Sequence, residues 1–493
     1  MKTLITIILF LAFSVFSSQS QDFQFLWANS YDVSNCNEVG AIAVDSNQNI
    51  IISGVHEGPV FIPYKGDIYI IKTDPDGDTI WSSKMNGELI LGDMIAMGNN
   101  IIIVGQGYGT FSYKGIEYGG ASYFLFALML DAEGELVWYF DDESKYGTYA
   151  NLSAGENDNF LLHARTQSNL GDWIMIIDLD GNILNEKLLS PNHTLINHVV
   201  YYNEKVYMNG QLSGFSGVFI DTVYIPQSPL ESTAFVLALD ESLTGEWVSI
   251  DTTLTNGDGR IVANENGLFA YQETLTPPFN LVKNLKKFDF DGELLKEIVV
   301  PSFNPNALIL PEIAISDNRI GLFCKNSSNS DNFKLLIFDD ELELIEEKVV
   351  IGPSDQYSNQ MANQGQHFII SHIYTGDLNM NDEITLPYGG SGKVPYIAKI
   401  EGSTVTYTTQ NFEKFEKLMI YPNPAIDKIH IKTNYEFEVT GISVMNFSGR
   451  ILLESDVIPA DSNFDVSQLA PGVYVLKCNL ANGSELIKKL IIR

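Results

Sequence analysis

Cysteine is scarce in this chain of 493 residues, and its scarcity excludes a disulfide-rich scaffold. The three cysteines, Cys36, Cys324 and Cys478, lie far apart, and one would remain after any pairing. The chain must therefore be stabilised by a large hydrophobic core. Because the sequence has no CxxC motif and no Cys/His cluster, we expect no structural zinc, no other metal and no cofactor.

Long apolar runs and catalytic signatures are also missing. After residue 20 there is no stretch of eighteen uninterrupted apolar residues, so no transmembrane helix is expected. No G-x-S-x-G elbow, HExxH motif or phosphate-binding loop occurs in a supporting context. None of the seven histidines forms a metal-spaced pair, and 62 acidic residues make any choice of glycosidase carboxylates arbitrary. These absences weigh against an enzyme and leave no catalytic residue to name.

Basic residues are few, and the formal net charge is −33. The region between the N-terminal 20 residues and Phe412 carries 19 basic and 52 acidic residues, and 19 − 52 accounts for the whole net charge. Such a surface repels nucleic acid and anionic membranes, so neither is expected as a partner.

The N-terminus has the pattern of a secretory signal peptide. Lys2 supplies a basic start, residues 4–16 form a short apolar run, and residues 18–20 form a small-residue cleavage site. We therefore expect residues 1–20 to be removed and the mature chain to be secreted.

An internal repeat fills the next 390 residues or so. Its first marker is an aliphatic strand followed by small or polar residues, clearest at Asn49–Gly54 and Asn100–Gly105. Weaker copies begin at Asn159, Lys205, Gly267, Arg319 and His367, with spacings of 46 to 62 residues. Units of this length, each holding about four short strands, are typical of β-propeller blades.

The second marker is a strand that ends in Asp-x-x-Gly, often with Trp four residues after the Gly, as at Asp74–Gly77 with Trp81. It also occurs seven times, alternating with the first marker. Asp bonds its own backbone and Gly supplies a positive φ, so this is turn chemistry. The alternation of Asp74, Asp76 and Asp78 also resembles the start of a calcium loop, but the distal ligands of such a loop are missing.

The sequence therefore predicts an all-β chain with a β-propeller of about seven blades over residues 21–410. The irregular spacings also allow six or eight blades. Because Phe25–Ser30 resembles Ile80–Ser83, we expect the N-terminal strand to join the last blade and close the ring. The first unit, Gly40–Gly77, also resembles the bacterial SBBP-type β-propeller repeat, which supports the fold more than a function.

A candidate ligand site follows from aligning the seven aliphatic strands. If these are the innermost strands, polar side chains near their ends meet at one mouth of the channel. The predicted ligand-binding residues are Gln106, His163, Arg165, Gln211, Glu273 and Lys325. The alternative is that these strand ends are simply solvated.

The last eighty or so residues contain Tyr421-Pro-Asn-Pro424, Gly472-Val-Tyr474 and a basic, aliphatic final strand. In this order the motifs resemble the type A C-terminal sorting domain of the type IX secretion system of Bacteroidetes. The resemblance implies a small immunoglobulin-like β-sandwich over residues 418–493, recognition by the secretion machinery, and cleavage in a linker at 411–417. The sorting signal would comprise Pro422, Asn423, Pro424, Gly449, Gly472, Tyr474, Lys488, Lys489 and Arg493.

Taken together, these features predict a protein exported via the periplasm and either secreted or held at the outer-membrane cell surface. We expect a binding or adhesion module whose propeller recognises a glycan or a surface protein. The alternatives are an extracellular enzyme that degrades polysaccharide or protein, and a structural surface protein without a small ligand.

Overall fold

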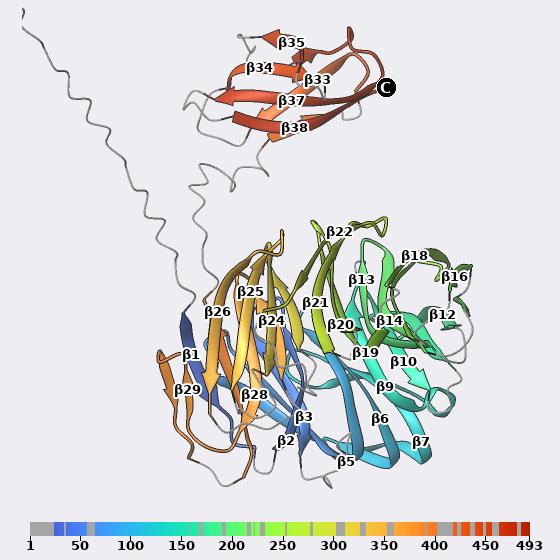
Figure 1. Ribbon diagram of the computed structural model, residues 1–493, viewed down its shortest axis with the longest axis vertical. Helices are drawn as coiled ribbons and strands as arrows, with labels where there is room; N and C mark the ends of the chain where they lie inside the picture. The colour runs from blue at the N-terminus through green and yellow to red at the C-terminus, as the bar shows by residue number, and fades with distance from the viewer. Residues whose placement is uncertain are drawn as a thin grey trace, which may run out of the picture. The chain divides into compact units, whose positions relative to one another are not determined.

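The chain divides into two compact units, Met1–Ser403 and Thr404–Arg493 (Figure 1). The computed structural model describes residues 24–33, 36–56, 65–155, 157–166, 171–189, 194–213, 218–220, 222–226, 232–251, 254–276, 280–301, 311–325, 332–352, 359–389, 392–401, 418–421, 425–433, 439–446, 450–455, 463–480 and 485–493. The predicted signal peptide and the predicted linker at 411–417 lie outside these residues.

The described part of the first unit contains seven antiparallel blades of four strands, which form a propeller. Four blades are separate sheets, two share one seven-stranded sheet through the long strand β5, and one belongs to a six-stranded sheet. Blade 1 contains β2 (Cys36–Val44), β3 (Ile50–His56), β4 (Gly66–Thr73) and the first half of β5 (Thr79–Met97). Blade 2 contains the rest of β5, β6 (Asn100–Tyr113), β7 (Ile116–Leu130) and β8 (Leu136–Asp142), and the short helix η1 (Glu143–Lys145) follows it. Blade 3 contains β9 (Gly147–Ala154), β10 (Asn159–Thr166), β11 (Asp172–Asp178) and β12 (Ile183–Leu189).

Blade 4 contains β13 (Thr194–Tyr202), β14 (Lys205–Ser213), β17 (Ser232–Leu239) and β18 (Gly245–Asp251), with a hairpin of β15 (Val218–Ile220) and β16 (Val223–Ile225). Blade 5 contains β19 (Leu254–Asn264), β20 (Gly267–Thr276), β21 (Asn280–Phe288) and β22 (Leu294–Val299). Blade 6 contains β23 (Glu312–Ser316), β24 (Arg319–Lys325), β25 (Phe333–Asp339) and β26 (Leu344–Ile351). Blade 7 contains β27 (Gln360–Gln364), β28 (His367–Tyr374), β31 (Val394–Ile400) and β1 (Phe25–Ser30).

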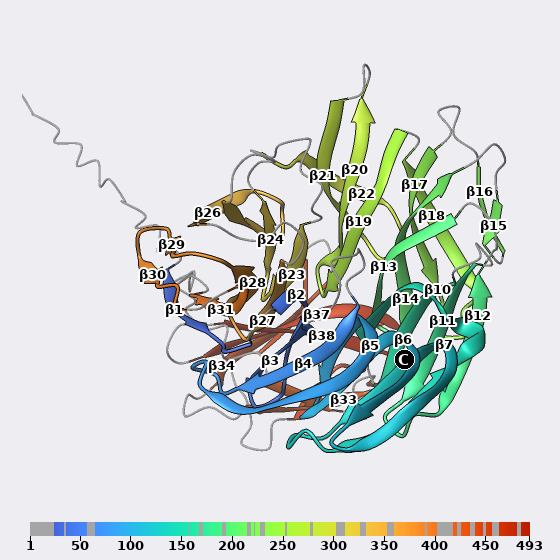
Figure 2. The same ribbon diagram turned by 90° about the horizontal axis from the view of Figure 1, so that it is seen from below.

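The blades surround a common centre, with the first strand of each blade beside the first strand of the next (Figure 2). These innermost strands are β2, the second half of β5, β9, β13, β19, β23 and β27. The aliphatic strands found in the sequence are all second strands, so the premise that they are innermost is wrong. Their sequences are apolar throughout because a second strand is packed on both faces, and this apolar pattern does not mark the innermost position.

Seven hydrophobic clusters lie between successive blades and explain this burial. In β3, Ile51 packs between blades 1 and 2, whereas Ile50 and Ile52 pack between blades 7 and 1. A strand buried on both faces has an almost continuous apolar sequence. An innermost strand, by contrast, has one face toward the channel and needs fewer apolar residues.

The N-terminal strand closes the ring, as the sequence predicts. β1 pairs antiparallel with β31, with Ala28 opposite Ala398. Trp27 on β1 faces Gly77 in the turn of blade 1, so the closing strand also contacts the next blade. A hairpin of β29 (Leu378–Met380) and β30 (Ile384–Leu386) extends from blade 7 onto the edge of blade 6.

The Asp-x-x-Gly sequences form the predicted turns. The Asp74 carboxylate accepts hydrogen bonds from the backbone N–H groups of Asp76 and Asp78, at 3.0 and 2.9 Å. The same pattern recurs at Asp131, Asp178, Asp289 and Asp339. These carboxylates are thus used within their own turns.

The tryptophans after these turns join neighbouring blades. Each indole N–H donates to the carbonyl of the second residue in the next blade's turn. The pairs are Trp81 with Ala132 at 2.9 Å, Trp138 with Leu179 at 2.8 Å, and Trp247 with Phe290 at 3.0 Å. The turn glycine allows the ring to approach, since a Cβ on Gly181 would lie 3.1 Å from the Trp138 ring.

The second unit has two antiparallel sheets around one core, a β-sandwich arrangement. One sheet contains β32 (Leu418–Tyr421), β33 (Lys428–Thr433) and β36 (Asn463–Asp465). The other contains β35 (Ile451–Ser455), β34 (Val439–Met445), β37 (Gly472–Leu480) and β38 (Glu485–Ile492). The immunoglobulin-like topology stays a prediction.

All three cysteines are free and buried. Among the described residues, no helix combines the length and the apolar character that crossing a membrane would require.

We predict that the Trp138 contact between blades 2 and 3 stabilises the ring. Trp138→Phe removes the N–H donor and one of the two fused rings and should lower the free energy of unfolding by about 2 kcal/mol. Trp138→Ala also removes the ring, which lies parallel to Phe160 with the ring centres 6.3 Å apart, and should cost about 3 kcal/mol. Urea unfolding monitored by far-UV circular dichroism measures both. Val137→Ala, at a neighbouring side chain that is 53% exposed, is the matched control, and equal losses in all three variants would contradict the prediction.

Candidate functional site

The six residues predicted to bind a ligand all lie on second strands of their blades, one strand away from the channel. They are Gln106 on β6, His163 and Arg165 on β10, Gln211 on β14, Glu273 on β20 and Lys325 on β24. His163 and Arg165 share one strand, whereas the other four come from four other blades, so a ligand site common to all six stays a prediction.

Burial differs among these residues. Gln106, His163 and Glu273 are buried, Arg165 and Gln211 are half-buried, and the side chain of Lys325 lies outside the described residues. The Glu273 carboxylate accepts a hydrogen bond from Tyr271 at 2.8 Å and pairs with Lys283 at 3.3 Å. Glu273 therefore takes part in an ion pair in the interior of blade 5.

His163 and Arg165 are brought together by Asp172 on β11. One Asp172 oxygen lies 2.8 Å from His163 Nε2 and 3.5 Å from Arg165 Nε. The Arg165 guanidinium also lies over the ring of Tyr149, 5.5 Å from its centre. Tyr149 belongs to the innermost strand β9, so this pair connects the second strand to the channel.

The channel itself contains ionisable side chains that the sequence analysis missed. Four innermost strands carry one at the fourth residue before the strand's end: Asp93 on β5, His198 on β13, Arg260 on β19 and Glu312 on β23. Strands β13, β19 and β23 lie side by side, and β9 lies between β5 and β13. Because the four residues occupy the same position in their strands, they share one level of the channel. We call these four residues and Tyr149 the channel cluster.

Contacts with Arg260 hold the channel cluster together. Its guanidinium donates to Glu312 at 3.0 Å, and both side chains are more than four-fifths buried. Burial lowers the pKa of Arg260, but the carboxylates of Glu312 and Asp93 outweigh it and raise that pKa overall. Asp93 accepts hydrogen bonds from the N–H groups of Leu152 and Met94, at 2.9 and 2.7 Å.

Two pKa values in the channel cluster move toward the uncharged form. Burial, together with Glu312, raises the pKa of Asp93 to about 6, even though two N–H donors act in the opposite direction. Burial and the nearby Arg260 charge lower the pKa of His198 to about 3. At neutral pH the cluster therefore contains a neutral imidazole beside a carboxylate that takes up a proton on mild acidification.

A signal for these residues was present in the sequence. Asp93, His198, Arg260 and Glu312 each lie seven residues before the first residue of an aliphatic marker. Gln360 occupies the same position in blade 7. Alignment of the residues before the markers, instead of those after them, would have found the channel cluster.

The first unit has two hollows to consider, one at the ends of the innermost strands and one where the ring closes. A cavity of about 710 Å³ is lined by the ends of innermost strands, including Leu152, His198, Ile261, Ala314 and Met361. It gives the channel cluster a neighbouring space that a ligand can occupy.

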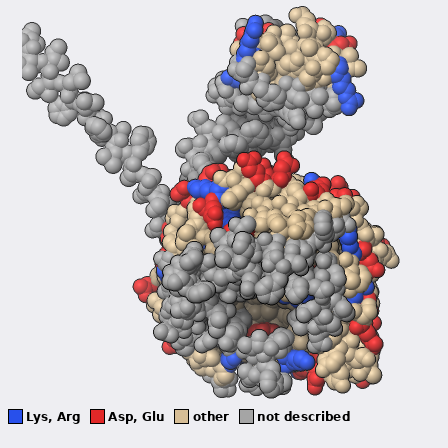
Figure 3. All heavy atoms as spheres, turned by 45° about the vertical axis from the view of Figure 1, so that its right-hand side comes forward, with Lys and Arg blue, Asp and Glu red and all other residues tan. Residues whose placement is uncertain are grey.

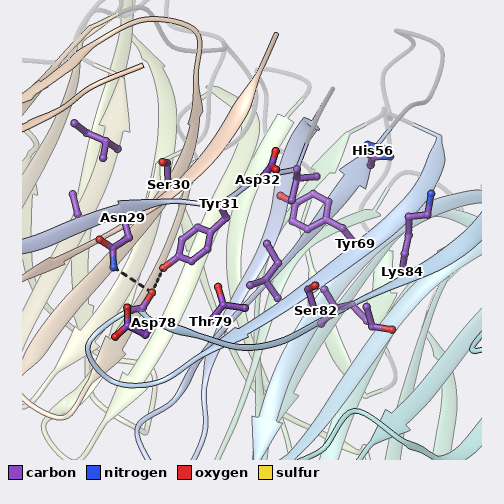
Figure 4. Close-up of a pocket in the computed structure, with 17 residues that line it drawn as sticks. Asn29, Ser30, Tyr31, Asp32, His56, Tyr69, Asp78, Thr79, Ser82 and Lys84 are labelled. Atoms are coloured by element: carbon purple, nitrogen blue, oxygen red, sulfur yellow. Dashed lines mark hydrogen bonds between the residues drawn. The ribbon is translucent and has the colours of Figure 1, made fainter. Parts of the chain in front are cut away.

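A second hollow, of about 910 Å³, lies between β1 and strands β4 and β5, where the ring closes (Figure 4). Tyr31 and Asn29 donate to the Gly77 carbonyl at 2.9 and 3.2 Å and bridge its floor. Its polar side chains include Ser82 and Lys84 on β5 and the buried His56 on β3. We assign it no function, because the hydrogen bonds across it tie the closing strand to blade 1.

Acidic side chains are spread over the visible surface of the first unit among uncharged ones (Figure 3). This distribution agrees with the excess of acidic residues between residue 20 and Phe412.

We predict opposite pH dependences for two channel residues. His198 binds its proton in the unfolded chain below about pH 6.5 but not in the folded chain until about pH 3, so acidification costs stability through this group. His198→Gln should remove that loss. Urea midpoints measured from pH 4 to pH 8 should therefore fall less steeply on acidification than in the unsubstituted chain.

Asp93 supplies the matched control, because its contribution to folding stability changes with pH in the opposite direction. The folded chain keeps its proton up to about pH 6, whereas the unfolded chain releases it near pH 4, so stability through Asp93 rises as the pH falls between these values. Asp93→Asn should abolish that rise. Parallel pH profiles for both variants and the unsubstituted chain would show that neither pKa is shifted.

The second unit presents part of the predicted sorting signal. Gly472 and Tyr474 lie on β37, Lys488 and Lys489 on β38, and the Arg493 N–H donates to the Ala425 carbonyl at 2.8 Å. The other predicted positions, Pro422, Asn423, Pro424 and Gly449, lie outside the described residues.

Known structures resemble the first unit only in outline. The β-propeller domain of the trilobed protease from Pyrococcus furiosus is 13% identical, covers 61% of this chain and 84% of that chain, and has a TM-score of 0.37. Quinohemoprotein alcohol dehydrogenase from Comamonas testosteroni is 11% identical, covers 76% of each chain and has a TM-score of 0.38. At these values neither likeness says anything about activity.

The sequence comparisons concern short segments. Beta-agarase D from Zobellia galactanivorans is 38% identical over 77 residues, which are 16% of this chain and 15% of that protein. The chain thus covers only a small part of this relative. Residues 419–493 match the family described as the secretion system C-terminal sorting domain. The chain is therefore a β-propeller protein that carries a type IX secretion sorting domain at residues 419–493 and is exported to the cell surface or the extracellular space.

Proposed function

We propose that the exported propeller is a binding or adhesion module with the channel cluster as its ligand site. The observation that carries this proposal is the convergence of ionisable side chains from separate blades at one level of the channel. Asp93, Arg260 and Glu312 supply acceptors and a donor, and His198 remains neutral at physiological pH. Polar groups that converge on a space in the interior are typical of ligand sites.

Binding is favoured over catalysis by the placement of the His–Asp pair. His163 and Asp172 have the spacing of a general base and its orienting carboxylate, but they are 0% and 2% exposed and cannot reach a substrate. The one feature that favours an enzyme is Asp93, since a carboxyl with a pKa of about 6 suits general acid catalysis. An extracellular polymer-degrading enzyme is therefore the second candidate.

We predict that neutralising the channel ion pair abolishes ligand binding. Arg260→Gln with Glu312→Gln replaces both charges of the pair by neutral amides, so that neither partner is left with an unpaired charge. The purified full chain and this double variant would be applied to arrays of polysaccharides and surface proteins, with retention and product masses recorded. A bound ligand should be retained at least about tenfold less well by the variant, the loss expected when a polar anchor is removed.

Lys296→Gln, with the change on the outermost strand β22, is the matched control and should bind normally. Equal retention of the double variant and the unsubstituted chain would exclude the channel as the site. New products that disappear in Asp93→Asn would instead establish the second candidate.

We also predict that export can be lost in a sorting-domain variant that still folds. Deletion of Lys488–Arg493 removes most of β38, which pairs with β37 along its length, and should leave the protein in the periplasm. A Cβ on Gly472 would approach no atom closer than 3.6 Å, so Gly472→Ala should fold. Its export, measured by surface and medium fractions, should nevertheless fall if the machinery reads this position. Ile426→Ala, at a side chain that is 72% exposed, is the control, and normal export of the deletion variant would refute the sorting role of β38.

A further inference from the structure

Three tyrosines, two exposed and one half-buried, form an aromatic ladder on blade 2 and the segment that follows it. Tyr108 on β6 and Tyr123 on β7 are cross-strand partners whose ring centres lie 4.4 Å apart. Tyr146, directly after η1, continues the row with its ring centre 4.6 Å from that of Tyr123. Tyr108 and Tyr123 are 44% and 41% exposed, although large aromatic side chains are usually buried. We call these three residues the tyrosine ladder.

The hairpin that carries the tyrosine ladder is anchored in the core. Phe111 and Phe124 on the same two strands are 2% and 1% exposed and stack with ring centres 6.3 Å apart. Tyr118 packs on Phe111 at 5.5 Å. The exposed rings are therefore held by rigid strands, which lowers the entropy lost when a ligand is bound.

The approach to the tyrosine ladder is open. Gly109, next to Tyr108, has a positive φ of 74°, and a Cβ there would meet no atom within 4 Å. A Cβ on Gly120 would meet only Glu143, at 3.4 Å. The Lys65 ammonium lies 5.3 Å from the centre of the Tyr123 ring, where it can donate a hydrogen bond to a ligand hydroxyl. Flat rings, open flanks and one donor suit a ligand with apolar faces and hydroxyl edges.

The tyrosine ladder leads toward the channel. Tyr146 is followed three residues later by Tyr149, whose ring lies beside Arg165. One run of chain therefore connects the tyrosine ladder with the channel cluster.

We propose that the tyrosine ladder is a subsite for a neutral polysaccharide, in which a sugar ring stacks on the face of Tyr108 that points away from Tyr123. This inference rests on the proposed binding function and names its ligand class. Nucleic-acid bases also stack on tyrosine, but the charge of −33 opposes a polyanion, and Glu143 beside Gly120 opposes sulfated or uronic chains as well. A protein partner would need a larger contact than three rings offer.

The test uses the full chain in affinity electrophoresis through gels that contain β-glucan, xylan, galactomannan or sulfated galactan. We expect retardation by at least one neutral polymer. Tyr108→Ala should weaken that retardation about tenfold, because it removes the ring on which the sugar stacks. Tyr123→Ala should weaken it as well, because it removes the ring against which Tyr108 is held. Tyr108→Phe keeps the ring and should bind like the unsubstituted chain. Tyr224→Ala, at a tyrosine of blade 4 that is 49% exposed, is the matched control and should also bind normally.

The outcomes separate this inference from the proposed function. If a neutral polymer retards the chain and the ladder variants behave like Tyr224→Ala, the tyrosine ladder is not the subsite and the binding function stands. Retardation by the sulfated galactan alone, or retention by a surface protein alone, would overturn the ligand class and leave the binding function in place. If the chain is retained by no polysaccharide and no protein, both proposals fail.

Discussion

The propeller depends on contacts that pass from each blade to the next, because no single four-stranded sheet can bury both of its faces. The indole of Trp138 shows how such a contact is made: its N–H binds the Leu179 carbonyl, and Gly181 leaves room for the ring. The Asp178 carboxylate holds that turn in shape through two N–H groups. The apolar packing between blades therefore depends on the polar Asp-x-x-Gly turns at the surface. The channel in turn keeps its geometry only while the ring of blades is closed.

Much of this fold was predictable, since its markers are local. An aliphatic strand such as Ile50–His56 and a turn such as Asp74–Gly77 each have a sequence pattern of their own, and both repeat seven times. What the pattern does not give is the order of strands within a blade. Continuous apolar sequence indicates burial on both faces, which describes a second strand, and our assignment of those strands to the channel was therefore wrong.

The candidate site was predictable only in part for the same reason. His163 and Arg165 adjoin the channel through Asp172 and Tyr149, but Glu273 pairs inside its blade with Lys283. The partners in these contacts are distant in sequence, and no single-sequence pattern gives their distances. The meeting of Tyr108 with Tyr123 likewise depends on the register of a hairpin, although residues 108–149 already hold twelve of the chain's 56 aromatic residues.

The placement of β31 has a mechanical consequence for a protein that works outside the cell. The chain leaves the propeller after this strand, and β31 is paired on both sides, with β28 and with the N-terminal β1. A pull transmitted from the C-terminal unit along β31 loads two ladders of hydrogen bonds in shear, so that many bonds must break together. The closing strand β1 thus also holds β31, the strand to which a pulling force on the C-terminal unit is applied. Through the contact of Trp27 with Gly77, β1 is itself held against blade 1.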